Sequence, residues 1–377
     1  MDRLAFRITH IAAYLLRWPC GIPVQTSFGI MLDRPAVFVR VQDASGHVGW
    51  GEIWCNFPAC GAEHRAKLLQ TVVSPIIQNK EFASPQDAFN EMQSRTDVLA
   101  IQSGELGPIS QVIAGVDLAI WDMLARKAEL PLWKFLGGKS DRIYVYASGI
   151  NPSNPEQAVL KKYAQGYRAF KLKVGFGSEK DLANLIAMRE CLPTSTDLMV
   201  DANQAWAVDE ALAMMEKLKP FDLKWLEEPI RADSAIDDWK QLAKQNAIPL
   251  AAGENIIGEK AFSSAIHSKA LTYVQPDSAK WGGITGCLPV IKATLDAGLT
   301  YCPHYLGGGV GLLASAHLMA AVGGVNAMLE IDSNANPLRT EFASCLNSVE
   351  DGIAFLGDNP GIGQVPQESE LREFRVI

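Results

Sequence analysis

The first part of the chain alternates between short apolar runs and turn residues, a pattern typical of β-strands. Residues 1 to about 60 read as strands, and the stretch AVFVRVQDASGHVGWGE predicts a hairpin with its turn at Asp43 to Gly46. We interpret residues 17–32 and 53–61, which are rich in Pro, Gly and aromatic side chains, as loops. From about 64 to 135 the apolar residues recur at helical spacing, as in ISQVIAGVDLAIWDMLARKA, which predicts helices.

Beyond residue 143 strand patterns alternate with helical ones. The candidate strands are IYVYAS, AFKLKV, DLMVDAN, LKWLEEP, PLAAGE, YVQPD, LTYCPH and AMLEID. Eight strands with helices between them predict a parallel β/α barrel. We therefore divide the chain into an α+β domain (1–135), a barrel (136–340) and a C-terminal segment (341–377) that returns to the first domain.

Polar residues recur near the ends of the predicted strands, at intervals of 23 to 28 residues. The series comprises Lys173, Asp201, Glu227, Glu254, Asp277, His304 and Glu330. One β/α unit of a barrel of roughly 250 residues has about this length, so all seven side chains are expected on the rim where barrel active sites lie.

Three of these carboxylates, Asp201, Glu227 and Glu254, come from consecutive strands. Buried together they would repel one another unless a cation neutralised them. An all-oxygen ligand set favours a hard ion, with Mg2+ first and Mn2+ second. In WLEEP the ligand could be Glu227 or Glu228, and Asn203 lies on the same face as Asp201, where it could orient a ligand or contact substrate.

Proton transfer is the chemistry expected of the remaining rim residues. Asp277 and His304 follow neighbouring strands, and a carboxylate bonded to one ring nitrogen raises the basicity of the other. Lys171 and Lys173 point to the same face of their strand. We expect a nearby cation to depress the pKa of Lys173, which would then act as a base opposite His304. Lys171 would assist Lys173 or contact a substrate carboxylate.

Composition narrows the range of partners and compartments. A net charge of -8 argues against nucleic-acid binding. The seven cysteines have no zinc-site spacing, which predicts reduced thiols in a cytoplasmic protein. The N-terminus lacks an apolar leader, and we expect no run of membrane-spanning length.

Together these motifs resemble the enolase superfamily and, within it, the mandelate racemase group. The resemblance rests on KLK at 171, VDAN at 200, WLEEP at 225, GEN at 253, QPDSAKWGG at 275, PH at 303 and LEID at 329, and extends to GWGE at 49. It implies a modified (β/α)7β barrel under an α+β capping domain, and a homo-oligomer. It also implies Mg2+ on Asp201, Glu227 and Glu254, with a small carboxylate as substrate.

The same resemblance assigns roles to the other rim residues. Lys173 would be one base, the His304–Asp277 dyad the other, Glu330 an electrophilic donor and Lys171 a helper. In the muconate-lactonizing group the second base is a lysine on the sixth strand. Lys280 lies three residues after Asp277, but we interpret it as the basic residue before the Gly pair, near the substrate.

The reaction expected is removal of the proton next to a carboxylate. Our leading interpretation is dehydration of an acid sugar to a 2-keto-3-deoxy acid. The alternatives are racemisation or epimerisation of an α-hydroxy acid, cycloisomerisation of a sugar-acid lactone, and a barrel that binds a metal carboxylate without turnover. Substrate choice is expected to depend on the two N-terminal loops, through Arg17, Trp18, Phe28 and Trp54.

Overall fold

The computed structural model describes residues 5–27, 29–245 and 248–376. The N-terminal part is a four-stranded antiparallel sheet in the order β3-β2-β1-β4, made of β1 (Phe6–Gln25), β2 (Ile30–Asp43), β3 (Val48–Ile53) and β4 (Glu81–Phe82). The helices of this part are α1 (Gly61–Leu68), α2 (Ser74–Ile77), α3 (Pro85–Ser103), α4 (Leu106–Lys127) and α5 (Leu132–Phe135), with a π-helical turn at Leu69–Val73.

The predicted hairpin between β2 and β3 is confirmed. Gln42 pairs with Val48, and the Asp43 carboxylate accepts hydrogen bonds from the backbone N–H groups of Ser45 and His47 inside the turn. The interpretation of residues 17–32 as a loop was wrong, because most of this segment belongs to the long β1–β2 hairpin. Its Pro and Gly residues are accommodated where the pairing register shifts, between Pro19 and Val24.

Helix α4 packs against the antiparallel sheet of the N-terminal part. It is long and apolar enough to cross a membrane by length and composition, so the expectation that no run has this length was wrong. Within the described chain most of this helix is buried, which explains its apolar character without a membrane. The sheet packs tightly on it: a Cβ at Gly49 would lie 2.1 Å from the carbonyl oxygen of Ala119, and one at Gly51 equally close to that of Gly115.

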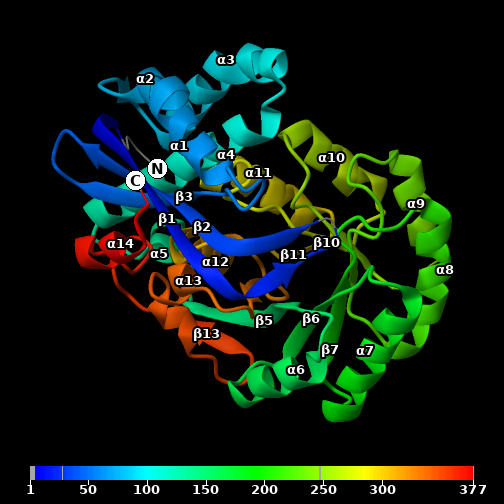
Figure 1. Ribbon diagram of the computed structural model, residues 1–377. Coiled ribbons are helices and arrows are strands. Elements are labelled where there is room, and N and C mark those ends of the chain that lie inside the picture. Colours follow the sequence, from blue (N-terminus) through cyan, green and yellow to red (C-terminus); the bar gives the residue numbers. More distant parts are fainter. Residues whose placement is uncertain (1–4, 28, 246–247, 377) are drawn as a thin grey trace.

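The barrel contains eight parallel strands in the order β11-β10-β9-β8-β7-β6-β5-β12. The strands are β5 (Arg142–Ile150), β6 (Ala169–Lys173), β7 (Asp197–Asp201), β8 (Leu226–Glu227), β9 (Leu250–Ala252), β10 (Tyr273–Val274), β11 (Thr300–Tyr301) and β12 (Met328–Asp332). The helices between them are α6 (Pro155–Ala164), α7 (Ser178–Cys191), α8 (Val208–Leu218), α9 (Ile236–Lys244), α10 (Glu259–Ser268), α11 (Gly283–Asp296) and α12 (Gly309–Val322). This arrangement confirms the predicted (β/α)7β barrel, with its helices on the outside (Figure 1).

The C-terminal segment contacts both parts. It contains α13 (Pro337–Thr340), a 3-10 turn (Ser344–Asn347), β13 (Ile353–Phe355) and α14 (Glu368–Phe374). As expected, it returns to the capping domain. The backbone N–H of Ile362 donates to the carboxylate of Asp122 on α4, and Arg375 forms an isolated antiparallel β-bridge with Leu16. It also adds a strand to the barrel, since β13 pairs antiparallel with β5, which the sequence did not predict. The boundaries at 135 and 340 stay predictions.

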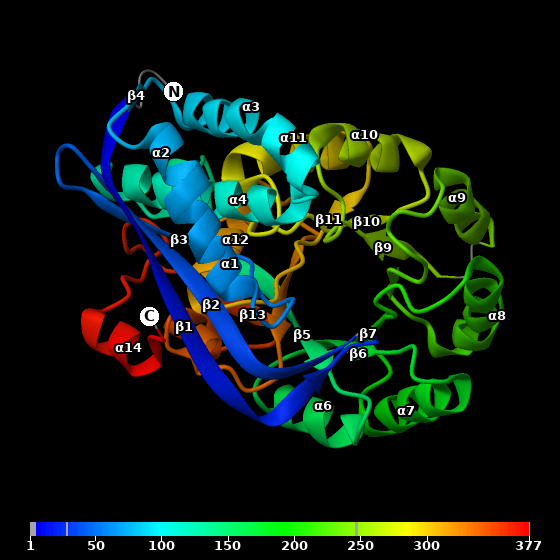
Figure 2. The ribbon, with the colours of Figure 1, turned by 45° about the horizontal axis from the view of Figure 1, so that its top comes forward.

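The β1–β2 hairpin extends from the helices of the capping domain across the barrel in both ribbon views (Figures 1 and 2). Hydrogen bonds join the domains at this end. Ser27 Oγ donates to the backbone oxygen of Asn203 (2.8 Å), and the Glu52 carboxylate accepts from the N–H groups of Gly308 and Gly311 at the start of α12. The strand ends of the barrel are therefore covered by a fixed part of the capping domain.

Candidate active site

The two lysines of β6 point into the barrel toward carboxylates. Lys171 Nζ lies 2.6 Å from Glu227 Oε1 and 2.8 Å from Glu330 Oε1. Lys173 Nζ lies 2.6 Å from Asp201 Oδ2 and 2.8 Å from Asn203 Oδ1. The spacing of two residues thus places both ammonium groups on one face of the strand, as expected.

The expected depression of the Lys173 pKa depends on a bound cation and stays a prediction, whereas the side chains around Lys173 act in the opposite direction. Burial alone would lower the pKa of Lys173, but the charge of Asp201 outweighs it and the pKa is raised. Burial would likewise lower the pKa of Lys171, and Glu227 and Glu330 raise it well above its usual value. Both lysines are therefore held as cations by the carboxylates they contact, and Lys173 can act as a base only when the charge of Asp201 is engaged elsewhere.

The three predicted metal ligands lie at the ends of β7, β8 and just beyond β9, with Asp201 and Glu227 buried and Glu254 partly exposed. Asp201 is in register with Glu227 across the β7–β8 pair. Among the residues that the structure describes, no three His, Cys, Asp or Glu side chains gather closely enough to hold an ion. Each carboxylate pairs with a side-chain cation, Asp201 with Lys173, Glu227 with Lys171 and Glu254 with His304, and their joint binding of an ion stays a prediction.

The chemistry of this donor set still fits a hard dication. Its groups are carboxylates on neighbouring strand ends, which supply the oxygen ligands that such an ion prefers. The side-chain amides of Asn203 and Asn255 orient two of them by donating to Asp201 and Glu254. Burial would raise the pKa of Glu254, but His304 and Lys280 hold it well below its usual value, so this carboxylate is an anion at neutral pH. A cation of charge two could replace the side-chain cations as counter-charge.

Both glutamates of WLEEP reach the site. Glu227 Oε2 accepts from Trp225 Nε1 (3.1 Å) and Gln275 Nε2 (2.7 Å), and burial raises the pKa of Glu227 to about 7. Glu228 has a left-handed backbone (φ 37°), and both of its carboxylate oxygens lie within 3.0 Å of Asn255 Nδ2. Burial and the charge of Glu254 raise the pKa of Glu228 well above its usual value. The choice of Glu227 as ligand stays a prediction.

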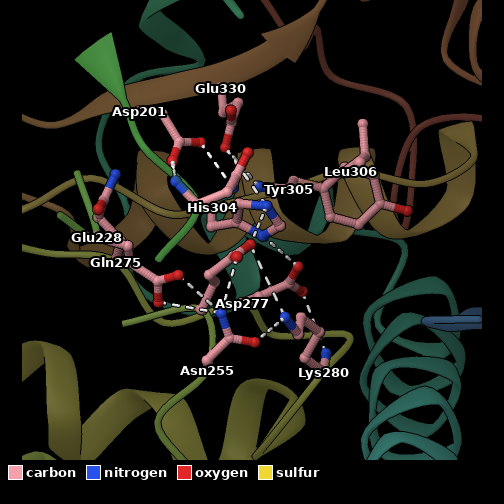
Figure 3. A network of polar contacts seen from close by, with 12 residues as sticks. Asp201, Glu228, Asn255, Gln275, Asp277, Lys280, His304, Tyr305, Leu306 and Glu330 are labelled. Carbon is pink, nitrogen blue, oxygen red and sulfur yellow. Dashed lines mark hydrogen bonds and ion pairs between the residues drawn. The ribbon is translucent and has the colours of Figure 1, made fainter. Parts of the chain in front are cut away.

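The expected dyad is present in geometry. His304 Nδ1 lies 2.7 Å from Asp277 Oδ2, and the other Asp277 oxygen accepts from the N–H groups of Ala279 and Lys280. His304 Nε2 pairs with Glu254, and Figure 3 shows His304 between Glu330 and Asp277. Burial would lower the pKa of His304, but the Glu254 and Glu330 charges raise it well above its usual value. Asp277 thereby fixes the orientation of the ring and leaves Nε2 facing the carboxylates.

Glu330 is oriented by groups that the sequence did not reveal. Its oxygens accept from Ser148 Oγ at the end of β5 and from Tyr305 N–H (3.1 Å). Sequence reasoning also missed Gln275 and Asn255, which hold Glu227 and Glu228. Their positions carried a usable signal, because Gln275 precedes Asp277 by two residues and Asn255 directly follows Glu254.

The predicted substrate residues divide into two groups. Asn203 contacts Lys173 and Asp201, and Lys280 Nζ bonds Asn255 Oδ1 (2.8 Å) while lying 4.7 Å from the ring centre of Trp54. Arg17 instead forms ion pairs with Asp33 and Glu63, so the structure gives it a role within the capping domain.

Trp18, an aromatic residue of the first segment, lies away from this cluster. Trp18 pairs with Arg34 in the β1–β2 ladder and lines a cavity beside α6. Phe28 lies outside the described residues. The second N-terminal loop thus reaches the site through Trp54, and the first segment reaches it through Ser27, which contacts the backbone of Asn203.

The strand ends of this parallel barrel carry two lysines, a cluster of carboxylates and an Asp–His dyad. This combination is typical of a class of enzymes that act on carboxylates. Residues 9–137 match the family model of the mandelate racemase / muconate lactonizing enzyme N-terminal domain, and residues 156–370 match the enolase C-terminal domain-like model. The chain therefore belongs to the mandelate racemase / muconate lactonizing enzyme family of the enolase superfamily, and it is an enzyme.

Two solved structures show how closely the fold is shared. One, described as a mandelate racemase/muconate lactonizing enzyme from Bordetella bronchiseptica RB50, is 51% identical with a TM-score of 0.93 and covers 98% of this chain and 99% of that chain. A racemase from Streptomyces coelicolor, solved with bound magnesium, is 26% identical with a TM-score of 0.86 and covers 98% of this chain and 100% of that chain.

Two curated relatives have named reactions. D-galactarolactone cycloisomerase from Agrobacterium fabrum is 27% identical over 98% of this chain and 99% of its own length. L-talarate/galactarate dehydratase from Salmonella typhimurium is 34% identical over 71% of this chain and 66% of its own length. The relatives thus include a cycloisomerase and a dehydratase of acid sugars.

Proposed function

We propose that this enzyme is a Mg2+-dependent acid-sugar dehydratase that removes the proton next to the substrate carboxylate. The observation that carries the proposal is the placement of two proton-transfer groups at one carboxylate cluster. Lys173 contacts Asp201 from β6, while the His304–Asp277 dyad reaches Glu254 after β11 and β10. A substrate at this cluster would have a base on one side and a histidine acid on the other.

Magnesium is supported by the donor set and by a relative. The carboxylates of Asp201, Glu227 and Glu254 would hold the ion, and the racemase from Streptomyces coelicolor was solved with magnesium bound. When bound, Mg2+ would add positive charge at the substrate carboxylate, which makes the neighbouring C–H more acidic. Manganese is the second choice because it accepts the same oxygen ligands.

Different residues of the chain would take and donate the protons that the reaction moves. Lys173 takes the α-proton once its own pKa is no longer raised by Asp201. Lys171 would bring positive charge to a substrate carboxylate oxygen. Burial would raise the pKa of Glu330, but Lys171 and His304 lower it, so Glu330 would donate to that oxygen only after it has taken up a proton. His304, held by Asp277, donates a proton to the departing β-hydroxyl group, which leaves as water. The resulting enol then tautomerises to the 2-keto-3-deoxy acid.

Cycloisomerisation of a sugar-acid lactone is the second candidate. A relative from Agrobacterium fabrum that aligns along nearly the whole of this chain is named for that reaction. The aromatic ring of Trp54 beside Lys280 also offers more apolar surface than an open-chain polyol needs. In this case the same bases act, but the leaving group is a ring oxygen and no water is lost.

The deciding experiment is a screen of acid sugars and their lactones with Mg2+ in deuterated water. Dehydration is expected to give a product one water lighter, with deuterium at carbon 3 of the keto acid. A product of unchanged elemental composition that has lost its lactone ring would favour cycloisomerisation. Substrate that gains deuterium at the α-carbon and changes configuration would instead indicate a racemase or epimerase. No exchange and no product from any compound would favour a barrel that only binds carboxylates.

A further inference from the structure

A basic cleft lies outside the barrel wall, between α6 and residues 333–349 of the C-terminal part. Two cavities, of about 380 Å3 and 600 Å3, share Lys162, Gln165, Arg339 and Thr340 and so adjoin. Ile331 lines the smaller cavity. Because neighbouring strand residues face opposite sides, Glu330 points into the barrel while this cleft opens on the outer side of β12. In Figure 1, α6 lies beside the orange C-terminal segment.

Every charged residue that lines the cleft is a cation. These residues are Lys161, Lys162 and Arg339, and among the described residues no carboxylate is found in the lining of either cavity. The whole chain has a net charge of -8, so a cleft lined only by cations runs against the general charge of the protein. Burial, followed by the charge of Arg339, lowers the pKa of Lys162 to about 8. The lining of the cleft is therefore positively charged at neutral pH, and an anion bound there would favour the charged form of Lys162.

The charge behind the cleft is also unbalanced. Asp332 pairs with Arg34 at 2.7 Å and lies 3.8 Å from Arg339, so one buried carboxylate serves two guanidinium groups. Arg34 Nη1 is buried without a hydrogen-bond partner in the described part of the chain. Lys162 Nζ lies 5.4 Å from the ring centre of Tyr167 and has no carboxylate partner among the described residues.

The cleft also offers groups that suit an anion with a small carbon body. Ser333 lines the larger cavity, and its Oγ is buried with no hydrogen-bond partner among the described residues. The inner wall of the smaller cavity is apolar, with Leu312, Ile331 and Leu346. A ligand could place its negative charges beside the lysines and its carbon atoms against this apolar wall.

We propose that this cleft binds a small organic dianion, with Lys161, Lys162 and Arg339 as its counter-charges. Two groups share the required chemistry, a phosphate monoester and a dicarboxylate. Either would bring two negative charges to a site that has an excess of positive charge. The proposal is independent of the reaction at the barrel mouth, so its failure would leave the proposed dehydratase function untouched.

The test is calorimetric titration of the Mg2+-loaded enzyme at low ionic strength, with glucose 6-phosphate in one arm and succinate in the other. At least one is expected to bind, and binding should weaken tenfold or more in Lys162→Gln. The matched control Lys240→Gln changes an exposed lysine that pairs with Asp237 on α9, and should leave binding unchanged. The arm that binds more tightly identifies the anionic group.

Two results would overturn the proposal. One is that neither anion binds the wild-type enzyme at millimolar concentration. The other is that binding survives in both Lys162→Gln and Lys161→Gln but is lost in Lys173→Ala, which would place the anion at the barrel mouth. Thermal unfolding followed by circular dichroism verifies that each variant is folded before it is titrated.

Discussion

Lys171 Nζ lies 2.8 Å from Glu330 Oε1, although the two residues belong to the second and the last strand of the barrel. The same ammonium group lies 2.6 Å from Glu227, and its side chain is fully buried. One lysine therefore neutralises two carboxylates that the protein buries at its active site. Such a group affects stability as well as chemistry, because a buried charge without a partner is costly.

Replacing Lys171 with Met is expected to destabilise the protein by about 3–5 kcal/mol, because Glu227 and Glu330 would lose their shared counter-charge. Urea unfolding at pH 7 without added metal measures the loss. Lys292→Met is the matched control, since Lys292 forms an exposed pair with Asp296 that is worth about 0–1 kcal/mol. Equal effects of the two substitutions would contradict the role of Lys171.

The two proposed proton-transfer groups are tested by Lys173→Ala and His304→Asn. Each is expected to lower kcat by about 100- to 10,000-fold, the usual contribution of a positioned acid or base. Lys280→Ala removes the lysine that would be the base in the muconate-lactonizing pattern. Because Lys280 is bonded to Asn255 and lies over Trp54, its loss is expected to raise KM more than it lowers kcat. Full activity in His304→Asn with none in Lys280→Ala would reverse the assignment.

Metal dependence distinguishes Glu227 from Glu228. Chelation is expected to abolish activity, and Mg2+, or less effectively Mn2+, to restore it. Glu227→Gln should then leave little activation at any practical Mg2+ concentration. Glu228→Gln should weaken activation by only about 10- to 100-fold, the effect of a group that supports a ligand. This order follows from the strand register that places Glu227 beside Asp201, whereas Glu228 bonds Asn255. The reverse order would make Glu228 the ligand.

The rim of the site could be predicted from the sequence because the length of a β/α unit is nearly constant. Lys173, Asp201, Glu227 and Glu254 lie at or just beyond the ends of successive strands, as the spacing predicted. This holds even though β8 and β10 contain only two residues each. Side-chain partners from distant segments, such as Ser148 for Glu330, could not be predicted because nothing local specifies them. The same limit explains Arg17, whose partners Asp33 and Glu63 become neighbours only when the hairpin and α1 pack together.

A buried histidine far from the site predicts how stability depends on pH. His317 on α12 is fully buried, and its Nδ1 accepts a hydrogen bond from Trp133 N–H (3.1 Å). Burial lowers the pKa of His317 to about 3, from 6.5 in the unfolded chain. Below pH 6.5 the unfolded chain binds a proton that the folded protein does not, so stability falls as the pH decreases toward 3.

By pH 5 this group alone should cost about 2 kcal/mol relative to pH 8. His317→Asn keeps an acceptor near the Trp133 N–H but cannot be protonated, so its unfolding free energy should fall less between pH 8 and pH 5. Urea unfolding at several pH values compares this variant with wild type. His10→Asn, at an exposed position on β1, controls for the loss of a histidine as such. Parallel pH profiles for wild type and His317→Asn would show that this histidine does not limit stability in acid.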